Sequence, residues 1–474
     1  MSSLGHKAAQ WKLGQAVALL VSAVCYVGLA YYTPRHLFGQ LLLLFSGAFG
    51  AYAYLLRTGL TLRMGLLAAA LLRLLWLPAL PALSDDYHRF RWDGLLVAAG
   101  VNPYLYRPAQ LVTPSEAESR ATPADAAAQR PNVAPLALTP TAAALTTEFP
   151  LLNSPRYYSV YPPMCQAVFG FAAWLAPTSA RGVVLLMRLM LLLAEAGTAW
   201  LLLALLRAFG QPPTRALWYL LNPLVIVELT GNLHFEGLML SFFLLALWWL
   251  ARGRWALSAG VLGLAVGTKL LPVVALPLLI RRLGWRRFLA YGLVLAVVVG
   301  LLFVPFLSTE LLRNISRSLA LYFHNFEFNA SVYYLLRAVG YTLTGYNVIG
   351  TLGPALALIT AGTGFLLAIA ERQPTPLTLP RVLLLLLTVY YLLATVVHPW
   401  YLTPLVALSV LTPYRYPVVW SGMAVLSYAA YQTTAYTENL WLVGLEYGVM
   451  LAVLGWELQN ARQRPAACGR KHII

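Results

Sequence analysis

Long apolar runs recur along almost the whole of this 474-residue chain, and they constrain its fold more than any other feature. Most runs are about 17–25 residues long, the length of an α-helix that crosses the ~30 Å hydrocarbon layer of a bilayer. Sixty per cent of the residues are apolar and ten per cent are charged, against about 25% charged in a soluble domain. The runs do not alternate strictly, which argues against an outer-membrane barrel. The sequence therefore predicts an all-α, polytopic transmembrane helical bundle.

Length and hydropathy predict about 12–14 membrane spans. The first run follows basic residues and lacks a small-residue cleavage site, so it is expected to be a retained helix and not a signal peptide. The candidate spans cover roughly 12–32, 36–56, 63–83, 160–177, 181–206, 215–231, 233–251, 255–280, 287–307, 350–371, 380–397, 400–413, 416–433 and 440–458.

The basic residues predict an orientation. With the N-terminus in the cytoplasm, most arginine clusters between spans and the basic C-terminal tail fall on the inner side. This bias explains the net charge of +17 better than a nucleic-acid partner does, because the charges sit at helix ends. Four arginines do not fit, so spans four to eight could be misassigned, for example if one is re-entrant. Two long polar loops fall outside, at 84–159 and from near 308, and the Tyr-rich stretch 331–349 is typical of an interfacial segment.

The first outer loop begins with an unusual density of charge, in the segment SDDYHRFRWDGLLVAAGVNPYLYRP at 84–108. Asp85 and Asp86 directly follow a predicted transmembrane helix, and Arg89, Arg91 and Asp93 come within two helical turns. A partly desolvated carboxylate beside a second carboxylate has a raised pKa, which suits a general base. Nearby arginines can orient that base or bind a phosphate. The alternative is a solvated, charge-balanced loop start.

Lys269 is the one lysine of the chain that lies far from both ends. Placing an ammonium within a membrane helix costs ~2.5 kcal/mol or more, so such a residue is first considered functional. A departing lipid phosphate would need a cation of this kind. The alternatives are a structural ion pair with Glu195, Glu228 or Glu236, or a side chain that extends to the interface.

The order of motifs resembles that of the GT-C superfamily of membrane glycosyltransferases, most of all the bacterial mannosyltransferases that use polyprenyl-phosphate sugars. The similarity covers roughly 63–405 and leaves out the first two and the last two helices. One family segment often carries Asp where this chain has Glu236. The matching stretches are the acidic pair, Arg89-Phe90, Trp92-Asp93-Gly94, Gly100-Val101-Asn102-Pro103-Tyr104, Tyr161-Pro162-Pro163, Asn222-Pro223, Gly231–Gly237, Thr268–Pro272 and His398-Pro399-Trp400-Tyr401.

This resemblance implies an inverting hexosyltransferase, with mannose as the expected sugar. It divides the chain into two N-terminal helices (1–62), a catalytic module (63–330) and C-terminal helices (331–474). Asp86 is the expected general base and Asp85 the second candidate, since neighbouring carboxylates titrate as a unit. The residues expected to bind the donor phosphate are Arg89, Lys269, His324 and His398.

A further group of residues is expected to bind substrate or to shape the loops. For its aromatic members, and for His398 of the phosphate-binding group, an interfacial belt or cap is the open alternative. His234 and Glu236 have an uncertain role, because the orientation count places them on the inner side, away from the acidic loop, and a re-entrant segment would reverse this. The group consists of Trp92, Asp93, Asn102, Tyr104, Tyr161, Glu327, Trp400 and Tyr401.

The expected partners are a polyprenyl-phosphate-sugar donor, a glycolipid, lipid-linked glycan or polypeptide acceptor, and the lipid bilayer. The chain carries no nucleotide-binding signature, so a donor within the membrane fits better. Carboxylates and histidines can hold a divalent ion, but no metal or other cofactor is predicted. The resemblance places the chain in the bacterial plasma membrane, with its active site facing the periplasm or exterior and both termini in the cytoplasm. The alternatives are a lipid or glycan transporter or flippase, and a glycan ligase of related architecture.

Overall fold

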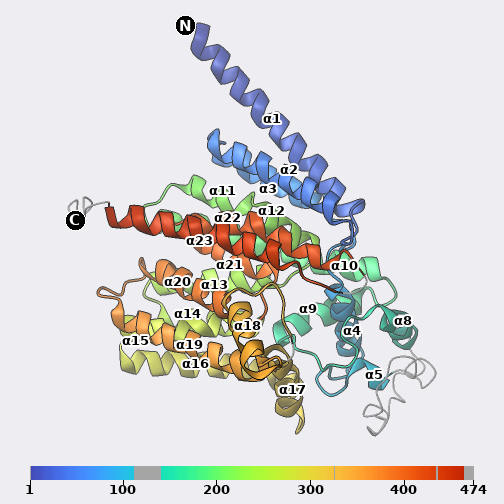
Figure 1. Ribbon diagram of the computed structural model, residues 1–474. Helices are drawn as coiled ribbons and strands as arrows, with labels where there is room; N and C mark the ends of the chain where they lie inside the picture. Colours follow the sequence, from blue (N-terminus) through green and yellow to red (C-terminus); the bar gives the residue numbers. More distant parts are fainter. Residues whose placement is uncertain (1, 112–139, 325, 434–435, 464–474) are drawn as a thin grey trace.

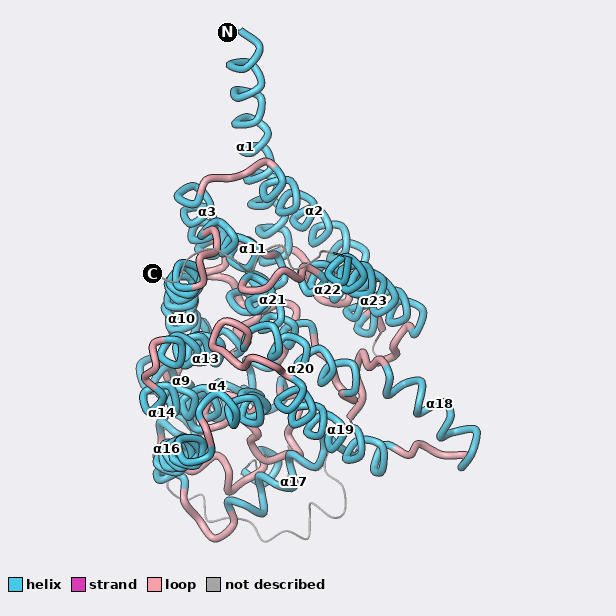
Figure 2. Tube along the Cα trace, turned by 90° about the vertical axis from the view of Figure 1, so that its left-hand side faces the viewer, coloured by secondary structure: helices cyan, strands magenta, loops and turns pink. Residues whose placement is uncertain are grey.

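The computed structural model describes residues 2–111, 140–324, 326–433 and 436–463. Helices dominate these residues and no strand occurs among them; one isolated bridge pairs Phe328 with Val396. Figure 1 shows the helices packed side by side, with the N-terminal part of α1 extending beyond the rest, and Figure 2 shows the same extension from a second direction. The prediction of an all-α, polytopic membrane fold is confirmed.

Six helices in the described part are long and apolar enough to cross a membrane. Their outward faces carry large apolar side chains, for example Leu289, Leu293 and Val297 on one helix. So much exposed apolar surface is stable in a bilayer and would aggregate in water. The six helices are α1 (Ser2–Tyr31), α2 (Phe38–Arg57), α10 (Ala180–Ala208), α16 (Trp285–Phe303), α19 (Ile349–Ala370) and α23 (Leu440–Gln463).

The other expected spans are shorter or broken helices, several of which begin at a proline that removes a helical hydrogen bond. The segment Pro223–Gly231 meets α13 at a bend of 113°, so predicted spans six and seven form one broken span or a re-entrant loop. These pieces are α3 (Leu62–Leu74), α9 (Pro163–Leu175), η2 (Pro213–Ala216), α11 (Leu217–Leu220), α12 (Pro223–Val225), η3 (Ile226–Gly231), α13 (Glu236–Ala251), α14 (Trp255–Val266), η4 (Leu271–Leu279), α15 (Ile280–Leu283), α20 (Leu379–Leu393), η6 (Pro399–Leu402), α21 (Thr403–Val410), α22 (Tyr416–Met423) and η7 (Ala424–Tyr431).

The two predicted outer loops contain helices of their own. α18 exposes Leu335, Val339 and Leu343, spaced one helical turn apart, as expected of an interfacial helix. α4, α5 and α8 lie together at the right of Figure 1. The loop helices are α4 (Asp86–Ala98), α5 (Pro108–Leu111), α8 (Pro140–Glu148), η1 (Phe149–Leu151), η5 (Val304–Phe306), α17 (Leu311–His324) and α18 (Val332–Thr344).

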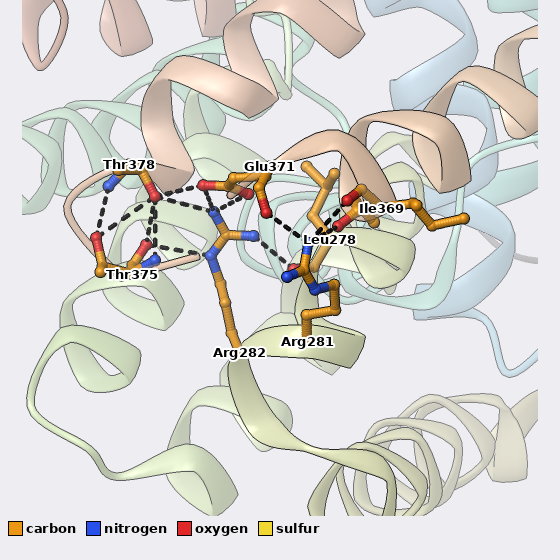
Figure 3. A network of polar contacts seen from close by, with 8 residues as sticks. Leu278, Arg281, Arg282, Ile369, Glu371, Thr375 and Thr378 are labelled. Atoms are coloured by element: carbon orange, nitrogen blue, oxygen red, sulfur yellow. Dashed lines mark hydrogen bonds and ion pairs between the residues drawn. The ribbon is translucent and has the colours of Figure 1, made fainter. Parts of the chain in front are cut away.

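Buried side chains form one large core, which includes residues of α1–α3, α10–α14 and α20–α22, and a second core among α4, α8, α9 and α10. The connection between α19 and α20 is tied to α15 by Arg282. Its guanidinium donates to both carboxylate oxygens of Glu371 at 2.6 Å and to the carbonyl oxygen of Thr375 at 3.1 Å (Figure 3). Neighbouring Arg281 donates to the carbonyl oxygen of Ile369, so both basic residues satisfy backbone or carboxylate groups near this turn.

Candidate active site

Helix α4 positions the acidic pair, and it is held by buried polar contacts. Arg89 donates to Asp93 at 2.9 Å, one turn along the helix. Asp93 in turn accepts from the hydroxyl of Ser159 at 2.5 Å and from the side-chain amide of Gln166 on α9 at 3.1 Å. Because all four side chains are buried and hydrogen-bonded, the contacts hold α4 and the returning loop in one arrangement.

Gly94 lets α4 approach α9 closely. A Cβ atom at Gly94 would overlap the carbonyl group of Phe169, which is backbone and cannot rotate away. We expect Gly94→Ala to lower the free energy of unfolding by about 2 kcal/mol through overpacking. Thermal unfolding in detergent measures the effect, and Gly260→Ala is the matched control, because a Cβ there has no atom within 4 Å and alanine favours a helix. Equal unfolding midpoints for the two variants would contradict the close packing.

The two adjacent carboxylates have different surroundings. Asp85 precedes α4 and forms an ion pair with Arg35, while Asp86 is the first residue of α4 and accepts a hydrogen bond from Asn153 at 3.0 Å. Desolvation raises the pKa of Asp86, and the hydrogen bond from Asn153 and the charge of Lys269 oppose that rise. A half-buried carboxyl with a raised pKa is a stronger base than an ordinary aspartate, which is what proton abstraction from a hydroxyl requires.

Lys269 lies at the break between α14 and η4, with its ammonium paired to Glu236. The same ammonium is 5.6 Å from the ring centre of Tyr401. The preceding residues are tied to the start of α9, where Met164 donates its N–H to the carbonyl of Gly267 at 2.9 Å. Glu236 is one of the three structural ion-pair partners that the sequence left open for Lys269. Lys269 nevertheless keeps 23% of its side chain exposed, whereas its partner Glu236 is 2% exposed.

His234 and Glu236 lie on the same side as the acidic loop, so the separation predicted from the orientation count is wrong. Glu236 pairs with Lys269, whose charge acts on Asp86. The reason is the bend of 113° between Pro223–Gly231 and α13, which places the first residue of α13, Glu236, beside Lys269. Leu233 at the bend has a φ of 62°, a left-handed conformation that is rare for a branched residue and is concentrated at functional sites.

A stack of rings extends from this bend. His234 lies against Trp400 with ring centres 3.6 Å apart, Trp400 against His398 at 4.3 Å, and His398 against Phe328 at 4.5 Å. Burial lowers the pKa of His398 to about 3, and the Lys269 ammonium adds to this effect. Burial and the Lys269 ammonium thus favour the neutral form of His398, which can donate a hydrogen bond to a phosphate, and its role in phosphate binding stays a prediction.

The Asn-Pro-Tyr motif of the first loop shapes the loop. Asn102 donates to the carbonyl of Phe306 at 2.8 Å, and its side-chain oxygen accepts from the N–H of Tyr104 at 3.0 Å. The Tyr104 hydroxyl donates to the carbonyl of Tyr161 at 2.6 Å, and Asn314 on α17 donates to the carbonyl of Tyr104. These bonds join the first loop, the start of α9 and the second loop.

The contacts of three further residues also favour structural roles. Trp92 is buried and packs near Phe149. Besides Asp93, Arg89 donates to two loop carbonyls at 3.0 and 3.1 Å, so Nε and Nη1 hold the loop. Its Nη2 is buried without a hydrogen-bond partner in the described structure, and the expected phosphate contact stays a prediction. Glu327 accepts from Arg337 and Tyr333 and therefore braces α18. The side chain of His324, at the end of α17, lies outside the described residues.

Three residues beside the acidic pair are not predicted from the sequence. Arg35 comes from the link between α1 and α2, Asn153 follows η1, and Tyr431 ends η7. They lie at 35, 153 and 431 in the chain, and no local motif marks them. Among the described residues no group of three or more His, Cys, Asp or Glu is arranged to hold a metal ion.

The fold and the site define a polytopic membrane protein. In it, the half-buried carboxylate of Asp86 lies close enough to the Lys269 ammonium to be affected by its charge. Residues 156–284 match the model of a family described as alpha-(1->6)-mannopyranosyltransferase, N-terminal domain. The alpha-(1->6)-mannopyranosyltransferase A of Corynebacterium glutamicum is 26% identical over 105 residues, which cover 22% of this chain and 21% of that protein. The chain thus matches about a fifth of the length of this relative. The resemblance to mannosyltransferases is confirmed, and it includes the segments around Glu236 and Lys269.

Proposed function

We propose that this chain is a membrane glycosyltransferase that moves a hexose, mannose by similarity, from a polyprenyl-phosphate donor to a hydroxyl acceptor. One observation carries the proposal: Asp86, the carboxylate best suited to be a base, lies close enough to the Lys269 ammonium for that positive charge to oppose the rise of its pKa. Glycosyl transfer from a phosphate donor needs a base for the incoming hydroxyl and a cation for the departing phosphate. The matched family and the matched relative are both described as mannosyltransferases, which supports mannose as the sugar.

The reaction would be a single displacement. Asp86 takes the proton of the acceptor hydroxyl as its oxygen bonds to the anomeric carbon, and the bond from that carbon to the phosphate oxygen breaks. The polyprenyl phosphate leaves as an anion, so it needs no proton, and Lys269 stabilises the charge that develops on it. One displacement inverts the anomeric configuration, as in inverting glycosidases. Neutral His398 can add a hydrogen bond to the phosphate.

We further propose an acceptor class and a membrane location for the reaction. The acceptor would be a glycolipid, a lipid-linked glycan or a polypeptide, and the site would face the periplasm or exterior of a bacterial plasma membrane. Both termini would then be cytoplasmic. The residues of the site suffice for this chemistry without a metal, and metal independence is part of the proposal.

Transfer of radiolabelled sugar tests the function. The purified full-length chain in detergent is supplied with polyprenyl-phosphate-mannose and lipid extract, and label in the acceptor fraction is counted, with polyprenyl-phosphate-glucose as the matched donor. We expect transfer from the mannose donor, and the same rate after treatment with a chelator. Label that crosses a proteoliposome membrane without forming a new glycosidic bond would favour a transporter instead, for which broken helices at the site are also typical.

A further inference from the structure

Arg35 joins the N-terminal hairpin to the acidic pair. It lies between α1 and α2, and its guanidinium forms an ion pair with Asp85. The guanidinium carbon is also 4.9 Å from the ring centre of Tyr431, at the end of η7. Arg35 and Asp85 expose 35% and 38% of their side chains, so the pair lies at the edge of the site. Arg35 and Tyr431 both lie outside the part of the chain that the family model matches.

Two neighbouring carboxylates raise a physical problem for a reaction that needs one base. Close like charges share their protons, and which carboxylate is ionised at a given pH depends on the pair. Here the two members differ in their partners: Asp85 is paired to a guanidinium, whereas Asp86 accepts a neutral amide donor, Asn153. A guanidinium remains charged at every physiological pH, so Arg35 places a permanent positive charge beside Asp85.

The charged and titratable groups that interact electrostatically with Asp86 come from several parts of the fold. They are Asp85 beside it, Arg35 from the α1–α2 link, Lys269 after α14, Glu228 and Glu236 around the bend, and Tyr431 at the end of η7. Two of them are cations, and Lys269 is already paired with Glu236. Arg35 is therefore the cation that offsets the charge of Asp85.

We propose that Arg35 is a positioning residue of the transfer reaction: it holds Asp85 as an ion-pair partner, so that Asp86 alone accepts the proton of the acceptor. The inference rests on the proposed function and deepens it, because it separates the roles of the two aspartates. It also makes the N-terminal hairpin, which the family resemblance leaves out, part of the site.

The charges of Arg35 and Asp85 determine in which direction each substitution moves the pKa of Asp86. Without Arg35, Asp86 loses a nearby positive charge and faces an unpaired Asp85, and both changes raise its pKa. A base works only when deprotonated, so the acid limb of the rate profile moves to higher pH. Asp85→Asn removes a negative charge and moves the limb the other way. The double variant Arg35→Ala/Asp85→Asn should therefore lie near the wild type.

A direct titration measures the pKa of Asp86 without relying on catalysis. The chain has four aspartates, at 85, 86, 93 and 125, so aspartate labelled with carbon-13 at the side-chain carboxyl adds few signals, and Asp86→Asn assigns one of them. We expect Arg35→Ala to raise the titration midpoint of Asp86 by about one pH unit. Arg35→Lys, which keeps the charge, should shift it much less. Arg57→Ala, at the far end of α2, is the matched control and should leave it unchanged.

The rate profile tests the link to function. The acid limb of mannosyl transfer should move with the titration in Arg35→Ala, and the lost rate should return as the pH rises. No shift of the Asp86 midpoint, or an equal loss of rate at every pH, would overturn the proposal. If Arg35→Ala does not fold, Asp85→Asn still tests the coupling between the two carboxylates, because it must lower the titration midpoint of Asp86. A wild type that titrates as expected but transfers no sugar would refute the proposed function and leave the charge arrangement standing.

Discussion

Asp86→Asn is expected to reduce kcat for mannosyl transfer by about 10³-fold, within the range that a general base contributes. Asparagine has the size of aspartate and can still contact the Asn153 side chain, but it cannot take a proton. Because Asp86 is half-buried at the start of α4, the substitution should leave the thermal unfolding midpoint nearly unchanged. Single-turnover transfer, with donor binding measured separately, isolates the chemical step from binding.

Asp85→Asn is the matched comparison, since it removes the neighbouring carboxylate and frees Arg35. It should keep at least about a tenth of the rate, because an ion-paired carboxylate is a poor base. If Asp85→Asn lost as much activity as Asp86→Asn, the two residues would act as one unit. Activity retained in Asp86→Asn would remove Asp86 from the mechanism and with it the central claim of the proposed function.

The second large effect is expected at Lys269. Lys269→Met should lower kcat by at least about 10²-fold, because the departing phosphate loses its cation. It should also destabilise the protein by about 3 kcal/mol, since it leaves Glu236, whose side chain is 2% exposed, without its partner. Transfer and thermal unfolding are measured on the same preparation.

A second substitution separates these two effects. In Lys269→Met/Glu236→Gln no unpaired buried charge remains, so the unfolding midpoint should return close to the wild-type value. Transfer should stay low, because the cation is still missing. Recovery of both properties in the double variant would show that Lys269 serves the fold and not the reaction.

The class of fold could be predicted from the apolar composition and from the length of the apolar runs. A helix that crosses a bilayer must be apolar and must have about that length. The six membrane-length helices coincide with predicted spans, and their apolar parts have ends that differ from the predicted ones by at most three residues. The prediction failed at 215–251, where hydropathy alone indicated two straight spans. Hydropathy sums over length and cannot detect that Asn232–Phe235 turns the chain by 113° within the bundle. The membrane side predicted for each later loop therefore depends on whether 215–251 is counted as one span or as two.

The candidate site, too, could be predicted only in part. Asp85, Asp86 and Lys269 could be found from the sequence, because a charge within an apolar chain is costly and therefore conspicuous. The positions of their partners could not. Asn153, Glu236 and Arg35 lie 67, 33 and 50 residues away from Asp86, Lys269 and Asp85, respectively, and such contacts follow from how helices pack, which no local pattern encodes.

The sequence by itself determined that this chain is a membrane-embedded helical bundle with an acidic outer loop and one buried lysine. Only the tertiary structure decided which of these charges meet. It directed Arg89 to the loop, paired Asp85 with Arg35, and brought Glu236 back to Lys269 through a bent segment. The physical reason is that the cost of burying a charge selects the residue type at each position, whereas the identity of the partner that offsets this cost depends on the packing of distant helices.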